Sequence, residues 1–570
     1  MEDVQALRRE ILMQANALYE AHRYAQAAEI AGELLAVFPA DAEMRYIRAA
    51  ALTEMGAYEE ARAEIEGIRA VCPDHVGAAR QEIYIDRAEG KIRTQIAHLR
   101  ALIAALEERI AAGKQPAYHA VFLASAYSLL GEALTLTGES AEAVDAFLAS
   151  SRLETMREKK AVEYSNALFA SNYLPARQRA SYAELARGYG KLFADVPPLA
   201  RASDARRGHK TLRIGYISPD LRAHPVGTLV QPLLALHDRT RFSVYCYANC
   251  AEDAVSARLR AHADVWRSIR GLSAEEAAAC VRSDAIDILV DLAGHTEQNV
   301  LPVLARRPAP VQVTGIGYFN TTGLPAIDYM LTDVHVDPSG TSDDAFTEEM
   351  LRLPHSHFCY TLPENLPTVT PPPMERRGHV TFGSFNNFSK VTEEVLHLWR
   401  ALLDAVPHAR LLVKSKLFGS AEGREIAAER FTRCGIAAER VEMRGFGPHH
   451  LAEYGDMDIA LDTFPYTGGM TTCEALAMGV PVVTLRGESH GARFGESLLR
   501  NANLPELIAK TPEDYVRLAV RLASSPEQLR TLRMELRPRL ERSPLMDAHT
   551  YVRDVEAAYT EIWEKFVHKA

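Results

Sequence analysis

Cysteine is scarce in this 570-residue sequence, and its spacing excludes two common kinds of cross-link. Seven cysteines are scattered along the chain, and none of them belongs to a CxxC pair. A disulfide framework or a zinc ribbon requires paired cysteines at regular spacings, so neither is expected here. The pattern predicts a protein of the reducing cytoplasm.

Positive charge and long apolar runs are also in short supply. The 64 Lys and Arg residues are outnumbered by 75 Asp and Glu residues, which gives a formal net charge of −11. An acidic chain is not typical of proteins built around phosphate-backbone contacts, so we expect no nucleic-acid partner. The start lacks a signal-peptide pattern and no apolar run reaches about 18 residues, so no membrane span is expected.

Several cofactor motifs are missing. Gly315-Ile-Gly317 begins a dinucleotide fingerprint, but Asn320 stands where the third glycine is required. Neither a GxxxxGK[ST] phosphate loop nor an HExxH zinc motif occurs. Asp456-Met-Asp458 resembles a metal-holding acidic pair, but it precedes an expected strand, where solvation or capping of a helix end explains it better. We therefore expect no cofactor and no metal.

The first 195 residues carry a helical repeat. The stretches 18–39 and 52–73 share an aromatic residue, a small residue and a terminal proline at a spacing of 34 residues. The matched pairs are Tyr24 and Tyr58, Ala27 and Ala61, and Pro39 and Pro73. This period is typical of tetratricopeptide repeats, in which alanine lets two helices approach closely and proline ends the second helix. A generic alanine-rich helical bundle is the alternative.

The repeat spacing is interrupted after the second unit. A third unit around Ser140 lies 82 residues after Tyr58, so the stretch 79–120 is expected to form a variant or extended helix pair. Stacked repeats form a concave groove that suits extended peptides, which predicts a protein or peptide partner. Helical sequence continues to about Leu192, and the prolines and basic residues of 196–210 predict a linker.

From Leu212 onward, short apolar strands alternate with helices. The first series of expected strands is 213–218, 242–247, 285–292, 311–316 and 329–331, and the second is 380–385, 410–414, 441–443, 459–461 and 480–484. The alternation predicts two doubly wound α/β domains with parallel sheets, at 211–370 and 378–570. Ligands bind such sheets at the carboxyl ends of the strands, so the cleft between the domains is the expected site.

The segment 462–479 carries the strongest chemical signal. A loop with Gly468 and Gly469 follows an expected strand, and a helix is expected to begin near Met470 or Thr471. Free N–H groups and the positive dipole end at a helix N-terminus suit a diphosphate. Glu474, one turn into that helix, is a candidate acceptor for ribose hydroxyls. An ordinary Thr-x-x-Glu helix cap is the alternative.

Two further strand-to-helix loops carry polar side chains. Asn387 and Lys390 follow the first strand of the second domain, and Lys390 is a candidate counter-charge for a diphosphate. His224 follows the first strand of the first domain and is a candidate general base, although a lone histidine is more often structural. His295 follows a later strand and is a weaker candidate of the same kind.

Taken together, these segments resemble glycosyltransferase family 41, the O-GlcNAc transferases with N-terminal tetratricopeptide repeats and the SPINDLY-type O-fucosyltransferases. The stretches that carry the resemblance are His224-Pro225, Arg307-Pro-Ala-Pro-Val-Gln312, Gly317-Tyr318, Phe385 to Lys390 and Leu461 to Pro481. The resemblance implies an α/α superhelix of repeats followed by a GT-B fold of two Rossmann-like domains. It also implies a bacterial member, inversion at the anomeric carbon, no metal, and Ser/Thr hydroxyls of proteins as acceptors.

The resemblance also implies roles for individual residues. His224 matches a catalytic histidine near the acceptor, Pro225 follows it, and Gly317 matches a loop glycine beside the sugar. Lys390 matches a catalytic lysine that stabilises the leaving diphosphate, and Asn387 falls where the family has a glutamine by the phosphates.

The remaining donor-binding residues come from the other end of the second domain. Thr471 matches a diphosphate-binding threonine, flanked by Met470 and Thr472 at the same helix mouth. Glu474 falls where the animal enzymes have an aspartate on the ribose, and His450 matches a histidine near the base.

The amino-acid sequence of the 468–474 segment differs from the corresponding motif of the animal enzymes. A histidine and one threonine of their motif are replaced, and Phe-Pro-Tyr with Thr-Thr-Cys-Glu is closer to the SPINDLY type. UDP-GlcNAc is therefore the default donor and GDP-fucose its rival. A non-catalytic, nucleotide-binding repeat scaffold is an alternative from another class. A sugar-nucleotide epimerase or small-molecule glycosyltransferase is disfavoured because a small acceptor needs no long concave surface.

Overall fold

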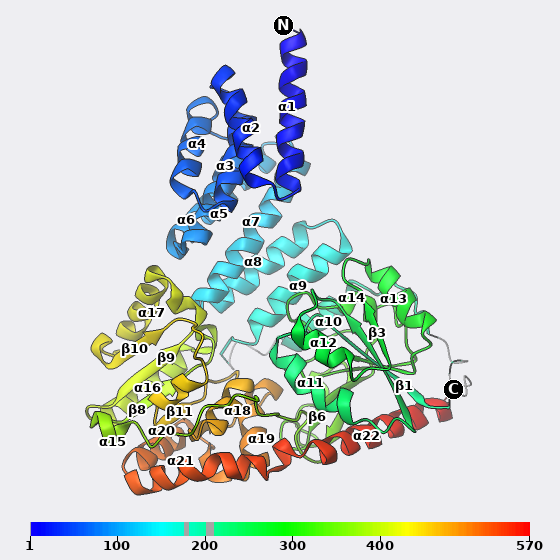
Figure 1. Cartoon of the computed structure of the whole chain (residues 1–570), viewed down its shortest axis with the longest axis vertical. Coiled ribbons are helices and arrows are strands. Elements are labelled where there is room, and N and C mark those ends of the chain that lie inside the picture. The colour runs from blue at the N-terminus through cyan, green and yellow to red at the C-terminus, as the bar shows by residue number, and fades with distance from the viewer. Residues whose placement is uncertain (1, 176–181, 201–203, 205–209, 570) are drawn as a thin grey trace.

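A helical N-terminal region stands on two α/β halves in the computed structural model, which describes residues 2–175, 182–200, 204 and 210–569 (Figure 1). The helical region is formed by α1 (Glu2–Glu20), α2 (Tyr24–Val37), α3 (Ala42–Glu54), α4 (Tyr58–Val71), α5 (Val76–Glu89), α6 (Ile92–Ala111), α7 (Pro116–Thr137), α8 (Ser140–Leu153), α9 (Arg157–Ser171) and α10 (Tyr182–Lys191). The fold class predicted from the sequence is confirmed.

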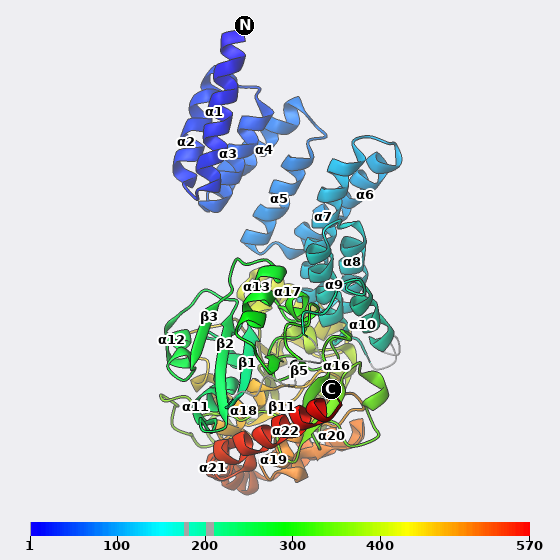
Figure 2. The ribbon, with the colours of Figure 1, turned by 90° about the vertical axis from the view of Figure 1, so that its right-hand side faces the viewer.

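The repeat residues have the positions that their pattern predicts. Tyr24 and Tyr58 open α2 and α4, and Ala27 and Ala61 are fully buried between neighbouring helices. A larger side chain at either alanine would hold the helices apart, because interiors of this kind are close-packed. Figure 2 shows α1 to α4 standing clear of the α/β halves.

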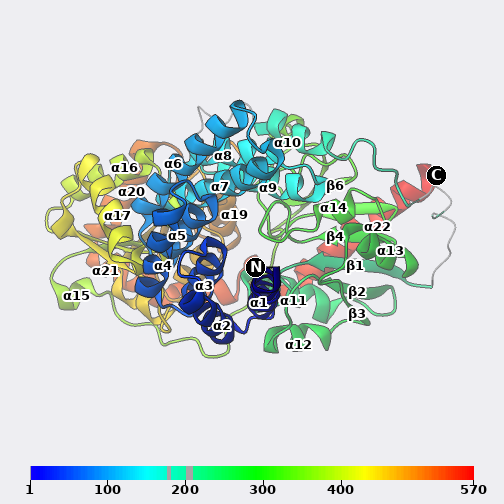
Figure 3. The ribbon, with the colours of Figure 1, turned by 90° about the horizontal axis from the view of Figure 1, so that it is seen from above.

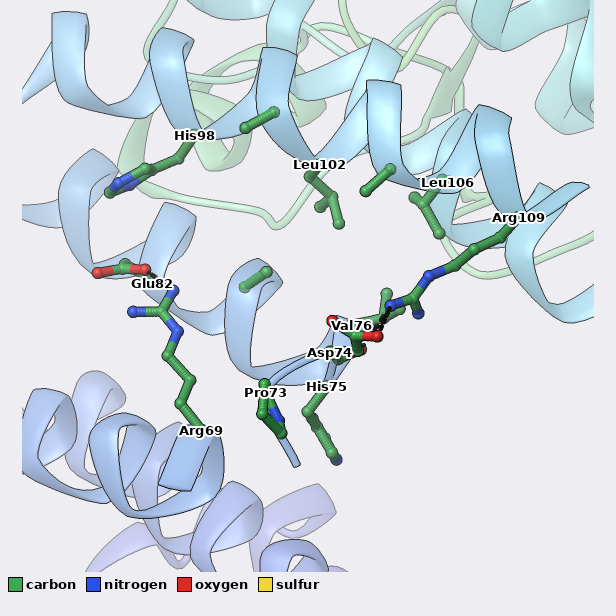
Figure 4. Close-up of a pocket in the computed structure, with 13 residues that line it drawn as sticks. Arg69, Pro73, Asp74, His75, Val76, Glu82, His98, Leu102, Leu106 and Arg109 are labelled. Carbon is green, nitrogen blue, oxygen red and sulfur yellow. Dashed lines mark hydrogen bonds and ion pairs between the residues drawn. The ribbon is translucent and has the colours of Figure 1, made fainter. Parts of the chain in front are cut away.

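The interrupted spacing is explained by α5 and α6. With 20 residues, α6 is longer than the 14-residue α2 and α4. A hollow of about 220 Å³ lies between α4, α5 and α6, with an apolar floor that includes Val76 and Leu102 (Figure 4). Its rim holds two ion pairs, Arg69 with Glu82 and Arg109 with Asp74. This hollow lies in the helical region, away from both sheets.

Among the described residues, α7 is the one helix long and apolar enough to cross a membrane by length and composition. Half of its apolar window, within Ala117–Thr137, is buried inside the protein, where α7 packs between α6 and α8. The expected lack of a membrane span stays a prediction. The predicted linker 196–210 falls largely outside the described residues, apart from 196–200, Asp204 and Lys210.

The first α/β half is built on a parallel sheet of seven strands in the order β3-β2-β1-β4-β5-β6-β7. The strands are β1 (Leu212–Ser218), β2 (Phe242–Ala248), β3 (Val265–Ser268), β4 (Ile288–Asp291), β5 (Val311–Thr314), β6 (Tyr329–Asp333) and β7 (Glu349–Leu353). The helices are α11 (Pro225–Leu236), α12 (Ala254–Arg260), α13 (Ala274–Ser283) and α14 (Leu301–Leu304). Every residue of β4, β5 and β6 is buried, as expected for strands covered on both faces.

The second half holds a parallel sheet of six strands in the order β10-β9-β8-β11-β12-β13. The strands are β8 (Thr381–Ser384), β9 (Arg410–Lys414), β10 (Val441–Arg444), β11 (Ile459–Leu461), β12 (Val482–Leu485) and β13 (Ile508–Ala509). The α-helices are α15 (Met374–Arg377), α16 (Glu393–Ala405), α17 (Ala421–Arg433), α18 (Met470–Ala477), α19 (Phe494–Asn501), α20 (Pro512–Ala523), α21 (Pro526–Glu541) and α22 (Ala548–Lys569).

The last helix returns to the first half. In Figure 1, α22 runs beneath both halves, and it packs on α11 and β7. The buried Glu556 carboxylate accepts hydrogen bonds from the His237 ring and from the Asp238 N–H. The chain from 378 to 570, predicted as the second domain, therefore ends in a helix that clamps the two halves together.

Three strands were not expected from the sequence, and a fourth is shorter than expected. The strands β3, β7 and β13 were not expected, because β3 and β7 are short and mix apolar with charged residues, and β13 has two residues. The expected strand 285–292 is shorter, since Ala285 has φ +51° and the Asp287 carboxylate accepts the Arg213 N–H from β1. Both features end the ladder before Ile288.

Candidate active site

Two loops meet at the carboxyl edge of the second sheet. Strands β8 and β11 are neighbours, so the loop that follows β8 and the loop that follows β11 lie side by side. Lys390, in the 3-10 turn η4 (Phe388–Lys390), donates a hydrogen bond of 3.1 Å from Nζ to the Thr467 carbonyl oxygen. The same ammonium lies 4.6 Å from the centre of the Tyr466 ring. Sequence reasoning placed Lys390 at this edge, and the structure puts it against the 462–469 loop.

Helix α18 begins at Met470, and its N-cap position has no capping side chain. Gly469 is the N-cap residue and supplies no side-chain hydrogen bond. The Thr471 hydroxyl instead donates to the Asn386 side-chain oxygen at 3.1 Å. The side-chain oxygens of Thr471 and Thr472 would both lie 2.7 Å from a Cβ at Gly468. The alternative reading as an ordinary Thr-x-x-Glu cap is therefore wrong, and the helix end is open to an anion.

Burial shifts the pKa values of Lys390 and Asp462 at the carboxyl edge of the second sheet. Desolvation lowers the pKa of Lys390 to about 8, although Asp462 opposes the shift. Desolvation raises the pKa of Asp462 to about 6, while the Gly468 N–H, the Thr484 hydroxyl and Lys390 hold it down. No ion pair joins Lys390 to a carboxylate within the part of the chain that the structure describes. The ammonium thus lies beside an uncapped helix end without a counter-ion in contact.

The Asp462 carboxylate shapes the loop that carries these groups. Its Oδ1 accepts from the N–H groups of Thr463 and Gly468 at 2.9 and 2.7 Å, and its Oδ2 accepts from the Thr484 hydroxyl at 2.7 Å. The side chain is 1% exposed, so all three bonds are shielded from water. The loop 462–468 is consequently held in one conformation around its aspartate.

A second cluster lies one turn into α18. The Glu474 carboxylate accepts from the Tyr454 hydroxyl at 2.9 Å and contacts His450 Nε2 at 2.8 Å. The Phe385 ring lies 4.6 Å from Tyr454 and 6.0 Å from His450, measured between ring centres. The structure thus brings the predicted residues His450 and Glu474 together beside an aromatic wall. This mixture of a carboxylate, a histidine and ring faces suits a nucleoside.

The first half contributes the opposite side of the site. Helix α11 begins at Pro225, with His224 as its N-cap. A Cβ at Gly317 would lie 2.0 Å from the Leu292 carbonyl oxygen and 3.1 Å from Val226, so only glycine fits beside the start of α11. Two residues later, the Phe319 ring lies 3.7 Å from the Cβ position of Gly469. The loop 315–320 therefore joins the start of α11 to the start of α18.

His224 has a fixed orientation. Its Nδ1 accepts the Val226 N–H at 3.3 Å and lies 3.6 Å from the Asp220 carboxylate. Burial, with a smaller contribution from Arg222, lowers the pKa of His224 below its usual value. With Nδ1 occupied as an acceptor, the neutral ring carries its proton on Nε2. His224 is accordingly set to donate a hydrogen bond from Nε2.

Some candidate residues lie apart from these clusters. Asn387 is exposed and its side-chain oxygen accepts from Ser415 at 3.4 Å. His295 is buried, with its ring between the Ser165 hydroxyl and the Thr322 carbonyl, and burial lowers its pKa to about 4. It joins the helical region to the first half and does not face the site.

The acidic pair at the opposite end of β11 has a structural role, as its sequence context indicated. The Asp456 carboxylate pairs with Arg377 and Arg444. The Asp458 carboxylate accepts the N–H groups of Met374 and Thr381. Both aspartates precede β11, at the amino edge of the sheet.

Sequence reasoning missed several contributors to the site. Asp462 and Tyr466 lie inside the segment it identified, but only their contacts with Gly468 and Lys390 reveal their roles. Phe319 and Arg430 carry no local motif. The Arg430 guanidinium donates to the carbonyl oxygens of Thr137 and Val391, and so links α7 to the residue that follows Lys390.

Comparison with known proteins identifies relatives of both regions. The family described as "Glycosyl transferase family 41" matches residues 192–369 and 376–555, and a tetratricopeptide repeat family matches residues 18–83. A probable UDP-N-acetylglucosamine–peptide N-acetylglucosaminyltransferase SPINDLY from Solanum lycopersicum is 40% identical over 410 residues, which is 70% of this chain and 44% of that protein. The chain thus matches less than half the length of this relative.

Two further similar proteins are a more distant relative and a solved structure. A UDP-N-acetylglucosamine–peptide N-acetylglucosaminyltransferase from Caenorhabditis elegans is 24% identical over 475 residues, covering 62% of this chain and 41% of that protein. A solved structure of an O-GlcNAc transferase mutant from Thermobaculum terrenum is 31% identical, covers 99% of both chains and has a TM-score of 0.76. The helical region and both α/β halves are therefore shared along the whole length of that protein.

Proposed function

Because the chain belongs to glycosyl transferase family 41, we propose that it moves GlcNAc from UDP-GlcNAc to Ser/Thr hydroxyls of proteins, with inversion at the anomeric carbon. The observation that carries the proposal is the positive charge at the second sheet, where no carboxylate of the described residues contacts the Lys390 ammonium. The Lys390 ammonium lies close to the uncapped start of α18, and among the described residues its polar and ring contacts are the Thr467 carbonyl and the Tyr466 ring. A diphosphate supplies the missing negative charge.

The same groups serve the chemistry as well as binding. When the bond between the sugar and the diphosphate breaks, negative charge grows on the leaving phosphate oxygens. The Lys390 ammonium and the N–H groups at the start of α18 are fixed before the reaction, so they stabilise that charge without reorganising. Glu474 and His450, one turn away, would receive the ribose and the base.

The acceptor would approach from the side of the first half. His224 and Pro225 lie at the start of α11, and the 315–320 loop lies between this helix end and the start of α18. Gly317 allows the close approach of the loop to α11. The Nδ1 contact with the Val226 N–H favours His224 as a hydrogen-bond donor that positions the acceptor hydroxyl or the sugar. The helical region, whose helices α2 to α7 lie above the second half and the middle of the molecule in Figure 3, would guide the acceptor segment.

We propose that catalysis needs no metal and no other cofactor. Lys390 and the α18 N-terminus supply the positive charge at the phosphates, and the Asp456 and Asp458 carboxylates are committed to arginines and backbone N–H groups. A cytoplasmic location and a bacterial source stay predictions from the sequence, supported by the scarce, scattered cysteines and by the full-length match to the Thermobaculum terrenum protein.

One binding experiment separates the candidate donors. Thermal unfolding is measured with UDP, GDP, UDP-GlcNAc and GDP-fucose at equal concentrations, followed by a transfer assay with labelled donor. We expect UDP and UDP-GlcNAc to raise the Tm most and labelled GlcNAc to appear on protein. A preference for GDP and GDP-fucose would replace the donor with GDP-fucose. Nucleotide binding without transfer of either sugar would leave a non-catalytic scaffold.

A further inference from the structure

A pocket that the proposed mechanism does not use opens at the carboxyl edge of the first sheet. It has a volume of about 470 Å³, and its lining includes Arg222, Asn249, Cys250, Arg270, Gln298 and Asn299. These residues follow four neighbouring strands: Arg222 follows β1, Asn249 follows β2, Arg270 follows β3, and Gln298 and Asn299 follow β4. The pocket is therefore built at the edge where parallel sheets bind ligands.

Charge in the pocket comes from two guanidinium groups. Arg270 is exposed, and no ion pair or hydrogen bond engages its guanidinium within the described part of the chain. The Arg222 side chain is 44% exposed, and its nearest carboxylate, Asp220, lies 3.8 Å away. Among the residues that the structure describes, no acidic residue lines the pocket. Both arginines are thus available to an anion from outside.

The acidic residues around the pocket are mostly engaged elsewhere. Glu252 pairs with Arg260 and accepts the Trp266 N–H. The Asp253 carboxylate accepts the N–H groups of Ala223 and Ser256. Asp220 is 5% exposed, and its carboxylate lies within 4 Å of Arg222 and His224. Glu297 is exposed beside the pocket and is the one acidic group here whose carboxylate no described residue engages.

The pocket lies next to the expected position of the acceptor hydroxyl. Arg222 and His224 are two residues apart in one loop, so their Cα atoms are at most about 7 Å apart. A peptide whose hydroxyl reached His224 would place a neighbouring side chain over Arg222. Arginine presents a planar fork of N–H groups that matches a carboxylate, and two such forks favour an acidic side chain over a neutral one.

We infer that this pocket selects protein acceptors that carry an Asp or Glu side chain within a few residues of the modified Ser or Thr. The inference rests on the proposed function for the presence of a protein acceptor. It adds a specificity-determining surface, centred on Arg222 and Arg270, to the first half of the molecule.

Binding of labelled peptides tests the inference without requiring sugar transfer. Fluorescence anisotropy at low salt compares two 12-residue probes, each with a central serine, one flanked by glutamates and one by lysines, with UDP present. We expect the wild-type chain to bind the glutamate probe at least tenfold more tightly. The double variant Arg222→Glu and Arg270→Glu should lose this preference or reverse it, and Arg270→Glu alone should reduce it severalfold.

A charge reversal elsewhere provides the control. Arg521→Glu, on the exposed face of α20, should leave the preference unchanged. Equal binding of both probes to the wild type, or an unchanged preference in the double variant, would overturn the inference. The UDP thermal shift reports separately on the proposed function, so failure of the pocket and failure of the donor site can be told apart.

Discussion

Lys390 holds its charge in a setting that opposes it. The side chain is half-buried and lies at the positive end of α18, and both features disfavour an ammonium. Its contacts are the Thr467 carbonyl and the Tyr466 ring, with Asp462 acting from a greater distance. An arrangement that is unfavourable in the free protein and is relieved by an anion is typical of binding sites.

The lowered pKa of Lys390 leads to a prediction for pH dependence. A pKa of about 8 means that the free protein carries the ammonium below pH 8 and loses it as pH rises through that value. A bound diphosphate favours the charged form and raises the pKa, so binding above pH 8 must take up a proton. The nucleotide affinity should change little between about pH 7 and 8 and fall up to about tenfold per pH unit above 8.

Calorimetry in buffers of different ionisation enthalpy measures this proton uptake directly. At pH 8.5, uptake of about 0.8 proton per UDP is expected in the wild type, as the Henderson–Hasselbalch fraction for a pKa of about 8. Lys390→Arg, which stays charged, should bind without this uptake. Uptake near zero in the wild type would contradict the assignment of Lys390 to the phosphates.

At the scale of elements, the loop 315–320 fixes how the two halves meet. Gly317→Ala would place a methyl group 2.0 Å from the Leu292 carbonyl oxygen, so the backbone must shift. We expect a loss of about 1–3 kcal/mol in the free energy of unfolding. Because Phe319 packs against α18 and Tyr466, nucleotide affinity should fall as well.

Chemical unfolding and UDP titration check this prediction. Gly419→Ala is the matched control, because its new methyl group meets no atom within 4 Å. If Gly317→Ala were as stable as the control, the close contact between the 315–320 loop and Leu292, the residue after β4, would not constrain the site.

The elements that the sequence predicted are those whose signal is local. Strand β1 is a mostly apolar run whose last five residues are buried, β5 is buried throughout, and α18 begins at the expected residue. The strands that were missed, β3 and β7, are short edge strands that mix apolar with charged residues. Their strand character comes from pairing with a neighbour, which no local pattern records.

The candidate site divides in the same way. Lys390, Thr471 and Glu474 could be predicted because each sits at a fixed offset from a strand end or helix start. The contacts of Lys390 with Thr467 and Tyr466 could not, because they join segments 76 and 77 residues apart. The catalytic and binding roles of these residues stay predictions.

At the scale of the whole molecule, the helical region contacts the segment that carries Lys390, in addition to its proposed role in guiding the acceptor. Helix α7 packs against the 3-10 turn that carries Lys390, and Arg430 of α17 donates to the Thr137 and Val391 carbonyl oxygens. Helix α22 clamps the two α/β halves from the opposite side. The segment 388–391, which carries Lys390, is therefore held by the helical region and by the second half, while α22 fixes the two halves relative to each other.

Replacing Arg430 tests this coupling. Arg430→Met leaves two buried carbonyl groups without a donor, which should cost about 1–3 kcal/mol for each group. The loosened 388–391 loop should also weaken UDP binding severalfold. Arg433→Met, on the exposed face of the same helix, is the control for both thermal unfolding and UDP titration. Unchanged UDP binding in a destabilised Arg430→Met protein would separate the helical region from the donor site.

The central claim, that Lys390 and the start of α18 hold the diphosphate of a nucleotide sugar, is tested most directly by calorimetric titration of UDP and GDP into Lys390→Ala. The control is Lys416→Ala, which removes an exposed lysine after β9 at the same sheet edge. The account predicts that Lys390→Ala weakens binding of the preferred nucleotide at least 100-fold and abolishes turnover, while Lys416→Ala matches the wild type. Equal affinity in the two variants, with near-normal turnover by Lys390→Ala, would contradict it.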